Sequence, residues 1–150
     1  MILVGFTGTR DRMTYLQRES LRVVLAEFAS PAGVELHHGD CVGADAEAAW
    51  IARAFGFRVV CHPPTDDSRR AFAPSDVTLP AEPFLSRNRA IVDACAVLVA
   101  APSSFGEQYR SGTWSTVRYA RRVGRRTVVV RPDGSVVRER WYVVTEGRIP

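Results

Sequence analysis

Hydroxyl-bearing residues and a glycine gather at Ser111, Gly112 and Thr113, shortly after an apolar stretch, residues 96–101, that ends at Pro102. An apolar run followed by a polar, glycine-bearing loop predicts a buried strand leading into a helix that opens at these three residues. The first-turn N–H groups of a helix lack partners within it, and the aligned peptide dipoles favour negative charge there. Gly112 allows close approach to the backbone, and Ser111 and Thr113 add hydroxyl donors. This stretch therefore predicts a phosphate site.

The same order of strand, glycine-bearing loop and helix occurs twice more, earlier in the chain. Apolar residues 2–6 lead into a loop that contains Gly8, Thr9 and Arg10. Residues 34–38 lead into a second loop, which contains Gly39, Asp40, Gly43 and Asp45. The carboxyl ends of parallel strands meet at one edge of a sheet, so all three loops are expected to border one crevice. The spacing is not G-x-G-x-x-G, and the ordinary dinucleotide fingerprint is absent.

The charged residues of these loops each have a structural and a functional interpretation. Arg10 either contacts a ligand or is solvated at the edge of the sheet. A carboxylate at a helix N-terminus either caps the helix or accepts hydrogen bonds from ribose hydroxyls. We expect capping from Asp45 and a ligand role for Asp40.

An Arg-Asn-Arg motif, Arg87, Asn88 and Arg89, lies on a helix predicted over residues 83–93. Neighbouring helical residues do not share a face, so one arginine is expected to enter the site while the other stays outside. His62 follows the strand at residues 57–61 and is expected to be packed or solvated rather than to bind a ligand. The histidines and cysteines show no Cys-x-x-Cys or His-x-x-x-His spacing, and we expect neither a metal nor a cofactor.

The composition is that of an ordinary globular protein, with 46% hydrophobic and 24% charged residues in a chain of 150. No apolar run approaches the roughly 18 residues of a membrane span, and no secretory signal is visible. Three scattered cysteines suit a reducing compartment, so a cytoplasmic location is expected. All 20 cationic side chains are arginine, which excludes a P-loop lysine and a lysine Schiff base. A genome biased against lysine codons also explains this usage.

Strands and helices alternate four times along the chain before a final strand and a hairpin signal at Asp133-Gly134. This order predicts an α/β fold in which helices cover both faces of a mainly parallel sheet. We expect a domain over residues 1–132 and, over residues 133–150, an antiparallel extension with strands at 135–137 and 141–144. The long polar segment, residues 65–83, is a candidate lid over the crevice.

These motifs, taken in order, resemble the SLOG superfamily, most closely the short stand-alone SLOG proteins of bacteria and phages. The matching stretches are residues 5–10, 38–45, 87–89 and 102–113, and the resemblance spans residues 2–132. It implies a Rossmann-like three-layer α/β/α fold that binds a nucleotide or a phosphoribosyl- or ADP-ribosyl-type ligand. It also implies a homodimer.

The resemblance includes LOG enzymes, which cleave the N-glycosidic bond of cytokinin ribotides, and the DNA-uptake protein DprA. LOG enzymes carry Pro-Gly-Gly-x-Gly-Thr-x-x-Glu, but here Pro102 lacks the glycine pair and Thr116 replaces the catalytic glutamate. Arg87 corresponds to the catalytic arginine, and Glu107 or Asp40 is a candidate substitute for the missing carboxylate.

Three functions follow from these observations. The first, which we favour, is a nucleotide-binding sensor or accessory module. The second is a nucleotide N-glycosidase that uses Arg87 with Glu107 or Asp40. The third is a DprA-like binder of single-stranded nucleic acid through the arginine-rich face at residues 118–126, whose weak interleaving with aromatics makes it the least favoured.

Overall fold

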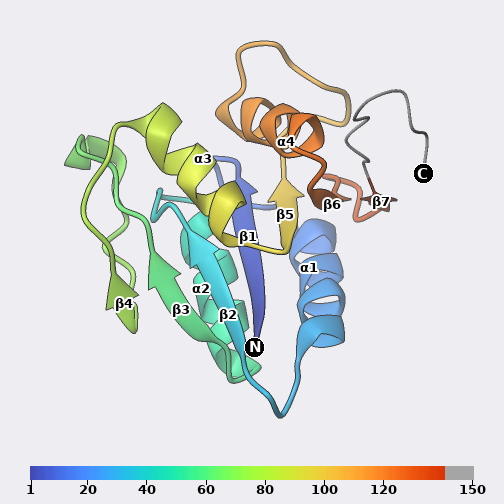
Figure 1. The fold of residues 1–150 in the computed structure, drawn as a ribbon. Coiled ribbons are helices and arrows are strands. Elements are labelled where there is room, and N and C mark those ends of the chain that lie inside the picture. Colours follow the sequence, from blue (N-terminus) through green and yellow to red (C-terminus); the bar gives the residue numbers. More distant parts are fainter. Residues whose placement is uncertain (141–150) are drawn as a thin grey trace, which may run out of the picture.

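The computed structural model describes residues 1–140, and residues 141–150 lie outside the described part of the chain. Seven strands form one sheet with the order β4-β3-β2-β1-β5-β6-β7 (Figure 1). The elements are β1 (Ile2–Gly8), α1 (Tyr15–Phe28), β2 (Val34–His38), α2 (Ala44–Ala54), β3 (Arg58–Cys61), a 3₁₀ turn (Asp67–Arg69), β4 (Val77–Thr78), α3 (Phe84–Ala94), β5 (Val97–Ala101), α4 (Gly112–Arg122), β6 (Arg126–Val130) and β7 (Val136–Glu139). No helix of the described residues is long and apolar enough to cross a membrane.

All neighbouring strands pair in parallel except β6 and β7, which form an antiparallel pair at one edge. The strand order reverses at β1, since β2 and β3 lie on one side of it and β5 and β6 on the other. Ligands of open α/β sheets bind outside the carboxyl ends of the strands at such a switch point. The expected Rossmann-like fold with a mainly parallel sheet and a C-terminal antiparallel pair is confirmed.

Helices cover both faces of the sheet and divide the core into two layers. In Figure 1, α3 lies in front of the sheet and α2 behind it. The larger apolar cluster joins α1 and α2 to the sheet through residues such as Phe6, Leu25 and Ile51. The smaller cluster joins α3 and α4 to the opposite face through Ile91 and Trp114.

Two helices begin at residues whose side chains cap them. Thr14 caps α1: its Oγ1 accepts from the Gln17 amide at 3.0 Å, and the Gln17 side chain accepts from the Thr14 amide at 3.3 Å. Ser111 caps α4, with its Oγ accepting from the Trp114 amide at 3.2 Å. Gln17 also forms contacts outside its own helix. Its buried Nε2 donates to the carbonyls of Pro102 and Val130, each at 2.9 Å. This side chain ties α1 to the ends of β5 and β6.

The segment expected as a lid packs instead along the edge of the sheet beyond β3. It contains β4, which pairs with β3 and was not predicted, because two residues are too few to show a period. The Asp76 carboxylate accepts from the Val59 amide at 2.8 Å and holds the segment there. At the other edge, Gly134 (φ +84°) turns the chain from β6 into β7. The strand expected at residues 141–144 lies outside the described residues.

Candidate functional site

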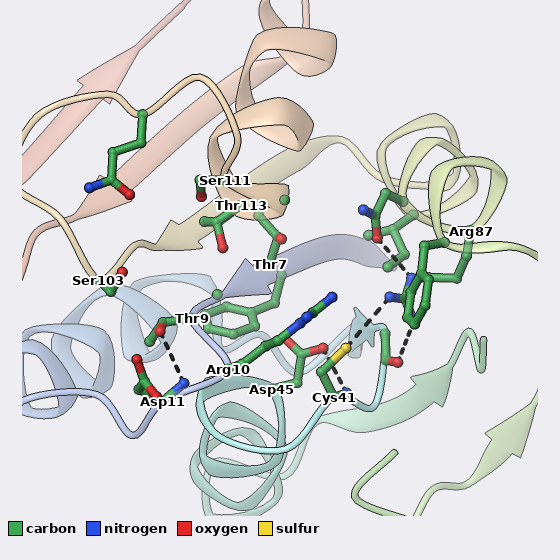
Figure 2. A pocket seen from close by; sticks show the side chains of 18 of the residues that line it. Thr7, Thr9, Arg10, Asp11, Cys41, Asp45, Arg87, Ser103, Ser111 and Thr113 are labelled. Carbon is green, nitrogen blue, oxygen red and sulfur yellow. Dashed lines mark hydrogen bonds between the residues drawn. The ribbon is translucent and has the colours of Figure 1, made fainter. Parts of the chain in front are cut away.

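A cleft of about 400 Å³ opens at the carboxyl ends of β1 and β5, where the strand order reverses (Figure 2). Four segments border it: the loop after β1, the loop between β2 and α2, the first half of α3, and the loop that leads into α4. The lining includes most of the ligand residues predicted from the sequence: Gly8, Thr9, Arg10, Gly39, Asp45, Arg87, Asn88, Ser111, Gly112 and Thr113. Sequence reasoning missed Asp11, Phe84, Ser103, Gln108 and Arg110.

The N-terminus of α4 forms one wall of the cleft. Both oxygens of Ser111 accept hydrogen bonds from the helix. Its Oγ accepts from the Trp114 amide, and its carbonyl accepts from the Ser115 amide at 2.9 Å. The amides of Gly112 and Thr113 have no acceptor among residues 1–140. Figure 2 shows the side chains of Ser111 and Thr113 at the cleft beside Thr7 of β1. Two uncommitted amides at a helix start form a local anion-binding element.

Two arginines of the lining, Arg10 and Arg110, form no ion pair within the described part of the chain. Both side chains are exposed. The Arg10 guanidinium lies 5.7 Å from the centre of the Phe84 ring, so it reaches across the cleft toward α3. Unpaired guanidinium groups beside a helix N-terminus make this cleft favourable for an anion with several oxygens.

Arg87 of α3 is buried and braces the floor of the cleft. Its Nη1 donates to the carbonyl oxygens of Gly39 and of His62, the latter at 3.2 Å. Its Nε donates to Asn88 at 2.8 Å, and Nη2 lies 3.6 Å from the Cys41 Sγ. Most of its donors are therefore used by the protein itself, which supports a positioning role. Arg89 lies outside on the exposed face, against the Tyr119 ring.

Asp45 is a buried carboxylate in the cleft wall. Its Oδ2 accepts from the Cys41 amide at 3.1 Å, whereas Oδ1 has no hydrogen-bond partner among the described residues. Burial raises the pKa of Asp45 to about 6, against the opposing effects of the Cys41 amide and Arg87. The N-cap of α2 is Gly43, and Asp45 is the second residue of the helix. The expected capping role was therefore wrong: Asp45 closes the preceding loop instead.

Asp40 lies outside the cleft lining and faces the opposite way. Its φ of +56° turns the fully buried carboxylate toward the segment after β3. There it accepts from Arg70 Nε at 2.9 Å, the Phe72 amide at 3.1 Å and the Ala73 amide at 3.0 Å. These three bonds occupy both oxygens, so the geometry argues against the catalytic and ligand roles expected of Asp40.

Glu107 is also absent from the cleft lining, although the next residue, Gln108, belongs to it. Glu107 pairs with Arg121 at 3.0 Å and with Arg118 at 3.7 Å, and it borders a separate cavity of about 250 Å³. Thr116, at the position of the LOG glutamate, donates its hydroxyl to the Gly112 carbonyl at 2.9 Å. The structure therefore brings neither proposed substitute for the missing glutamate to the cleft.

Gly43 is required by packing rather than by a ligand. It is absent from the lining, it has a φ of +91°, and a Cβ there would overlap the backbone carbonyl of Arg10. The neighbouring Ala44 amide donates to the Thr9 carbonyl at 3.0 Å. Close contact between these two loops fixes the backbone from which Arg10 extends.

The histidines form a buried chain behind the cleft. His37 Nδ1 and His62 Nε2 are 2.8 Å apart, and His37 Nε2 lies 3.0 Å from a Glu35 carboxylate oxygen. Burial lowers the pKa of His62 and that of His38 to about 4. His62 is packed, as expected, and does not line the cleft. In the described part of the chain, no group of three or more His, Cys, Asp or Glu side chains could hold a metal ion.

The arginine-rich stretch at residues 118–126 does not form one free basic face. Arg118 donates to the Tyr109 carbonyl at 3.0 Å, and Arg121 pairs with Glu139 at 2.9 Å. Arg125 donates to the Cys95 carbonyl at 2.6 Å. These side chains support the surrounding structure, so fewer charges are available for a nucleic-acid backbone.

No protein-family model matches this chain, and no curated protein matches it. Among solved structures, it is similar to a molybdenum cofactor binding protein from the phototrophic bacterium Rippkaea orientalis, with a TM-score of 0.67 and 18% identity over 87% of this chain and 76% of that one. The chain is also similar to DNA processing protein A (DprA) from Streptococcus pneumoniae. The TM-score is 0.64, with 20% identity over 86% of this chain and 50% of that one.

The molybdenum cofactor carrier protein from Chlamydomonas reinhardtii is similar as well. Its TM-score is 0.61, with 20% identity over 85% of this chain and 75% of that one. Together these likenesses show that the chain has a Rossmann-like α/β fold, the fold that its sequence predicts.

Proposed function

We propose that this protein binds a small molecule carrying a phosphate group, of the nucleotide or phosphoribosyl type, in the cleft between β1, β5, α3 and α4. The observation that carries the proposal is the meeting of uncommitted α4 amides with unpaired guanidinium groups at the switch point of the sheet. A phosphate would accept from the Gly112 and Thr113 amides while Arg10 and Arg110 contribute charge-assisted hydrogen bonds.

The size of the cleft agrees with a small-molecule ligand. At about 400 Å³ it falls within the range of roughly 300–1,000 Å³ that small-molecule sites occupy. Two similar structures are named for binding or carrying a small-molecule cofactor, which supports small-molecule binding on this fold. The half-buried ring of Phe84 supplies apolar surface for a base or a similar flat group.

Binding without turnover is favoured over N-glycosidic hydrolysis. Hydrolysis would require a carboxylate beside the scissile bond to activate water or to stabilise positive charge. Asp40 and Glu107, the candidates for this role, face other parts of the molecule. We therefore favour a sensor or accessory module. Hydrolysis in this cleft would have to use Asp45 or Asp11, the two carboxylates of its lining, and neither occupies the position of the LOG glutamate. The internally bonded arginines at residues 118–126 likewise make single-stranded nucleic acid the weaker alternative.

The proposal is tested by a thermal-shift panel in which each mixture is afterwards analysed for released base. The panel contains nucleoside mono-, di- and triphosphates, NAD, ADP-ribose, cytokinin ribotides and inorganic pyrophosphate. A ligand at a hundredfold excess over its dissociation constant adds about 2.7 kcal/mol, or roughly 5–10 °C for a chain of this size. We expect such a shift for phosphorylated ligands and no released base. No shift with any of them would overturn the proposal, and released base would establish the hydrolase instead.

A further inference from the structure

The cleft contains a buried hydrogen-bond acceptor that the proposed phosphate site does not use. Asp45 is 95% buried, with 5% of its surface exposed, and its side chain belongs to the cleft wall. Oδ2 is occupied by the Cys41 amide, but Oδ1 receives no hydrogen bond from any described residue. A buried carboxylate oxygen without a donor is costly, and most such atoms in folded proteins are satisfied.

The surroundings of Asp45 leave Oδ1 without a hydrogen bond. The Gly39 amide of the preceding loop approaches the carboxylate and lowers its pKa, but it makes no hydrogen bond with Oδ1. The charged and titratable groups that face Asp45 are Arg10 from the loop after β1, Arg87 from α3, and Cys41 and Asp40 from its own loop. Arg87 directs its donors to Gly39, His62, Asn88 and Cys41. Burial raises the pKa of the Cys41 thiol, so it is protonated, but it lies near Arg87 and forms no hydrogen bond with Oδ1.

We infer that Asp45 Oδ1 accepts a hydrogen bond from a neutral O–H or N–H group of the bound molecule. This inference rests on the proposed function and deepens it. The ligand then carries two features, a phosphate for the α4 N-terminus and a hydroxyl or amino donor for Asp45. Ribonucleotides and related phosphorylated sugars have both features, whereas phosphorylated compounds without a hydroxyl or amino group lack the second. Asp45 is thus a specificity-determining residue of the cleft.

Asp45→Asn isolates this role because of the bond to Cys41. The Cys41 amide requires an acceptor, so the carboxamide oxygen takes the Oδ2 position and the NH₂ group takes the Oδ1 position. The variant keeps the shape and the loop contact but presents a donor where the ligand needs an acceptor. Asp67→Asn is the matched control, because Asp67 is an exposed aspartate outside the cleft lining.

The experiment is calorimetric titration of the wild type and both variants with four probes. These are adenosine 5′-monophosphate, its 2′,3′-dideoxy analogue, purine riboside 5′-monophosphate, which lacks the exocyclic amine, and inorganic pyrophosphate. We expect at least tenfold weaker wild-type binding for the analogue that lacks the recognised donor. Weaker binding of the dideoxy analogue would identify a ribose hydroxyl as the recognised donor. Weaker binding of purine riboside 5′-monophosphate would identify the exocyclic amine. That preference should disappear in Asp45→Asn and persist in Asp67→Asn.

A second measurement needs no variant. Protonation of Asp45 occurs at Oδ1, since Oδ2 accepts from Cys41, and it converts the acceptor into a donor. The wild-type preference for the donor-bearing probe should therefore fall as the pH drops below about 6. Titration of the phosphate group itself affects both members of each probe pair equally and cancels in their ratio.

The outcomes separate this inference from the proposed function. If the wild type binds pyrophosphate and all three nucleotides with equal affinity at every pH, the role of Asp45 is overturned and the phosphate site stands. A preference that survives in Asp45→Asn also overturns it. If no probe binds, both proposals fall together.

Discussion

The guanidinium of Arg87 lies against Gly39 so closely that a Cβ at residue 39 would come within 2.6 Å of its Cζ atom. The same guanidinium donates to the Gly39 carbonyl. This contact joins α3 to the loop between β2 and α2, and both segments border the cleft. The shape of the cleft therefore depends on the buried Arg87 guanidinium, whose hydrogen bonds go to the protein itself.

Replacing Arg87 with alanine should destabilise the fold. The change leaves the carbonyls of Gly39 and His62 without their donor in a buried site, at a cost of about 2–5 kcal/mol. Arg89→Ala on the exposed side of the same helix should change stability by less than about 0.5 kcal/mol. Urea unfolding of both variants measures the difference. Equal stabilities would contradict the bracing role.

Asp40→Ala should release the segment that follows β3. Without the carboxylate, the amides of Phe72 and Ala73 lose their acceptor, and we expect a loss of about 2–4 kcal/mol. Hydrogen exchange at these two amides should accelerate strongly. Asp67→Ala is the control. Asp67 is exposed, and its Oδ1 lies 3.9 Å from Nη1 of Arg70, the arginine that also bonds to Asp40. Unchanged protection in Asp40→Ala would refute this anchor.

Removing Arg10 should weaken ligand binding without affecting stability. The side chain is exposed and forms no ion pair within residues 1–140, so the free energy of unfolding of Arg10→Ala should lie within about 0.5 kcal/mol of the wild-type value. A lost charge-assisted bond to phosphate should weaken binding of the best panel ligand about tenfold to a hundredfold. Arg12→Ala, which alters an exposed arginine outside the lining, should bind normally. Equal affinities of the two variants would exclude a role for Arg10.

Asp45 should make the protein less stable as the pH rises from about 4 to about 6. Its folded-state pKa of about 6 exceeds the unfolded value near 3.8, so the folded state holds more protons in this window and stability falls with pH. Relative to Asp45→Asn, the wild type should lose on the order of 1 kcal/mol between pH 5 and pH 8. Urea unfolding of both proteins at the two pH values measures this loss. Contributions of His38 and His62 are common to both proteins and cancel. A difference that is independent of pH would contradict the buried, uncompensated carboxylate.

Much of the site could be predicted because its signals are local. Each glycine-bearing loop follows an apolar run, and parallel strands bring the three loops to one edge of the sheet. Ser111 at the start of α4 and the alternation that defines the fold belong to the same class of signal. The two-residue strand β4 carried no such signal, because its pairing with β3 depends on the whole intervening segment.

The two aspartates of the second loop show where local reasoning fails. The sequence suggested a ligand role for Asp40 and a cap for Asp45, and the structure places Asp45 rather than Asp40 in the cleft wall. The decisive facts are the left-handed backbone of Asp40 and the donors it meets at residues 70–73. Those donors lie about thirty residues away, so spacing within the loop could not reveal them.

The most direct test of the phosphate site is a ¹H–¹⁵N spectrum of the protein titrated with adenosine 5′-monophosphate. We predict that the amides of Gly112 and Thr113 shift most, together with the Arg10 side chain, because these donors have no hydrogen-bond partners among the described residues. The control, titration with adenosine, which lacks the phosphate, should leave both amides unmoved. Saturable binding whose shifts lie elsewhere, with Gly112 and Thr113 unchanged, would contradict it.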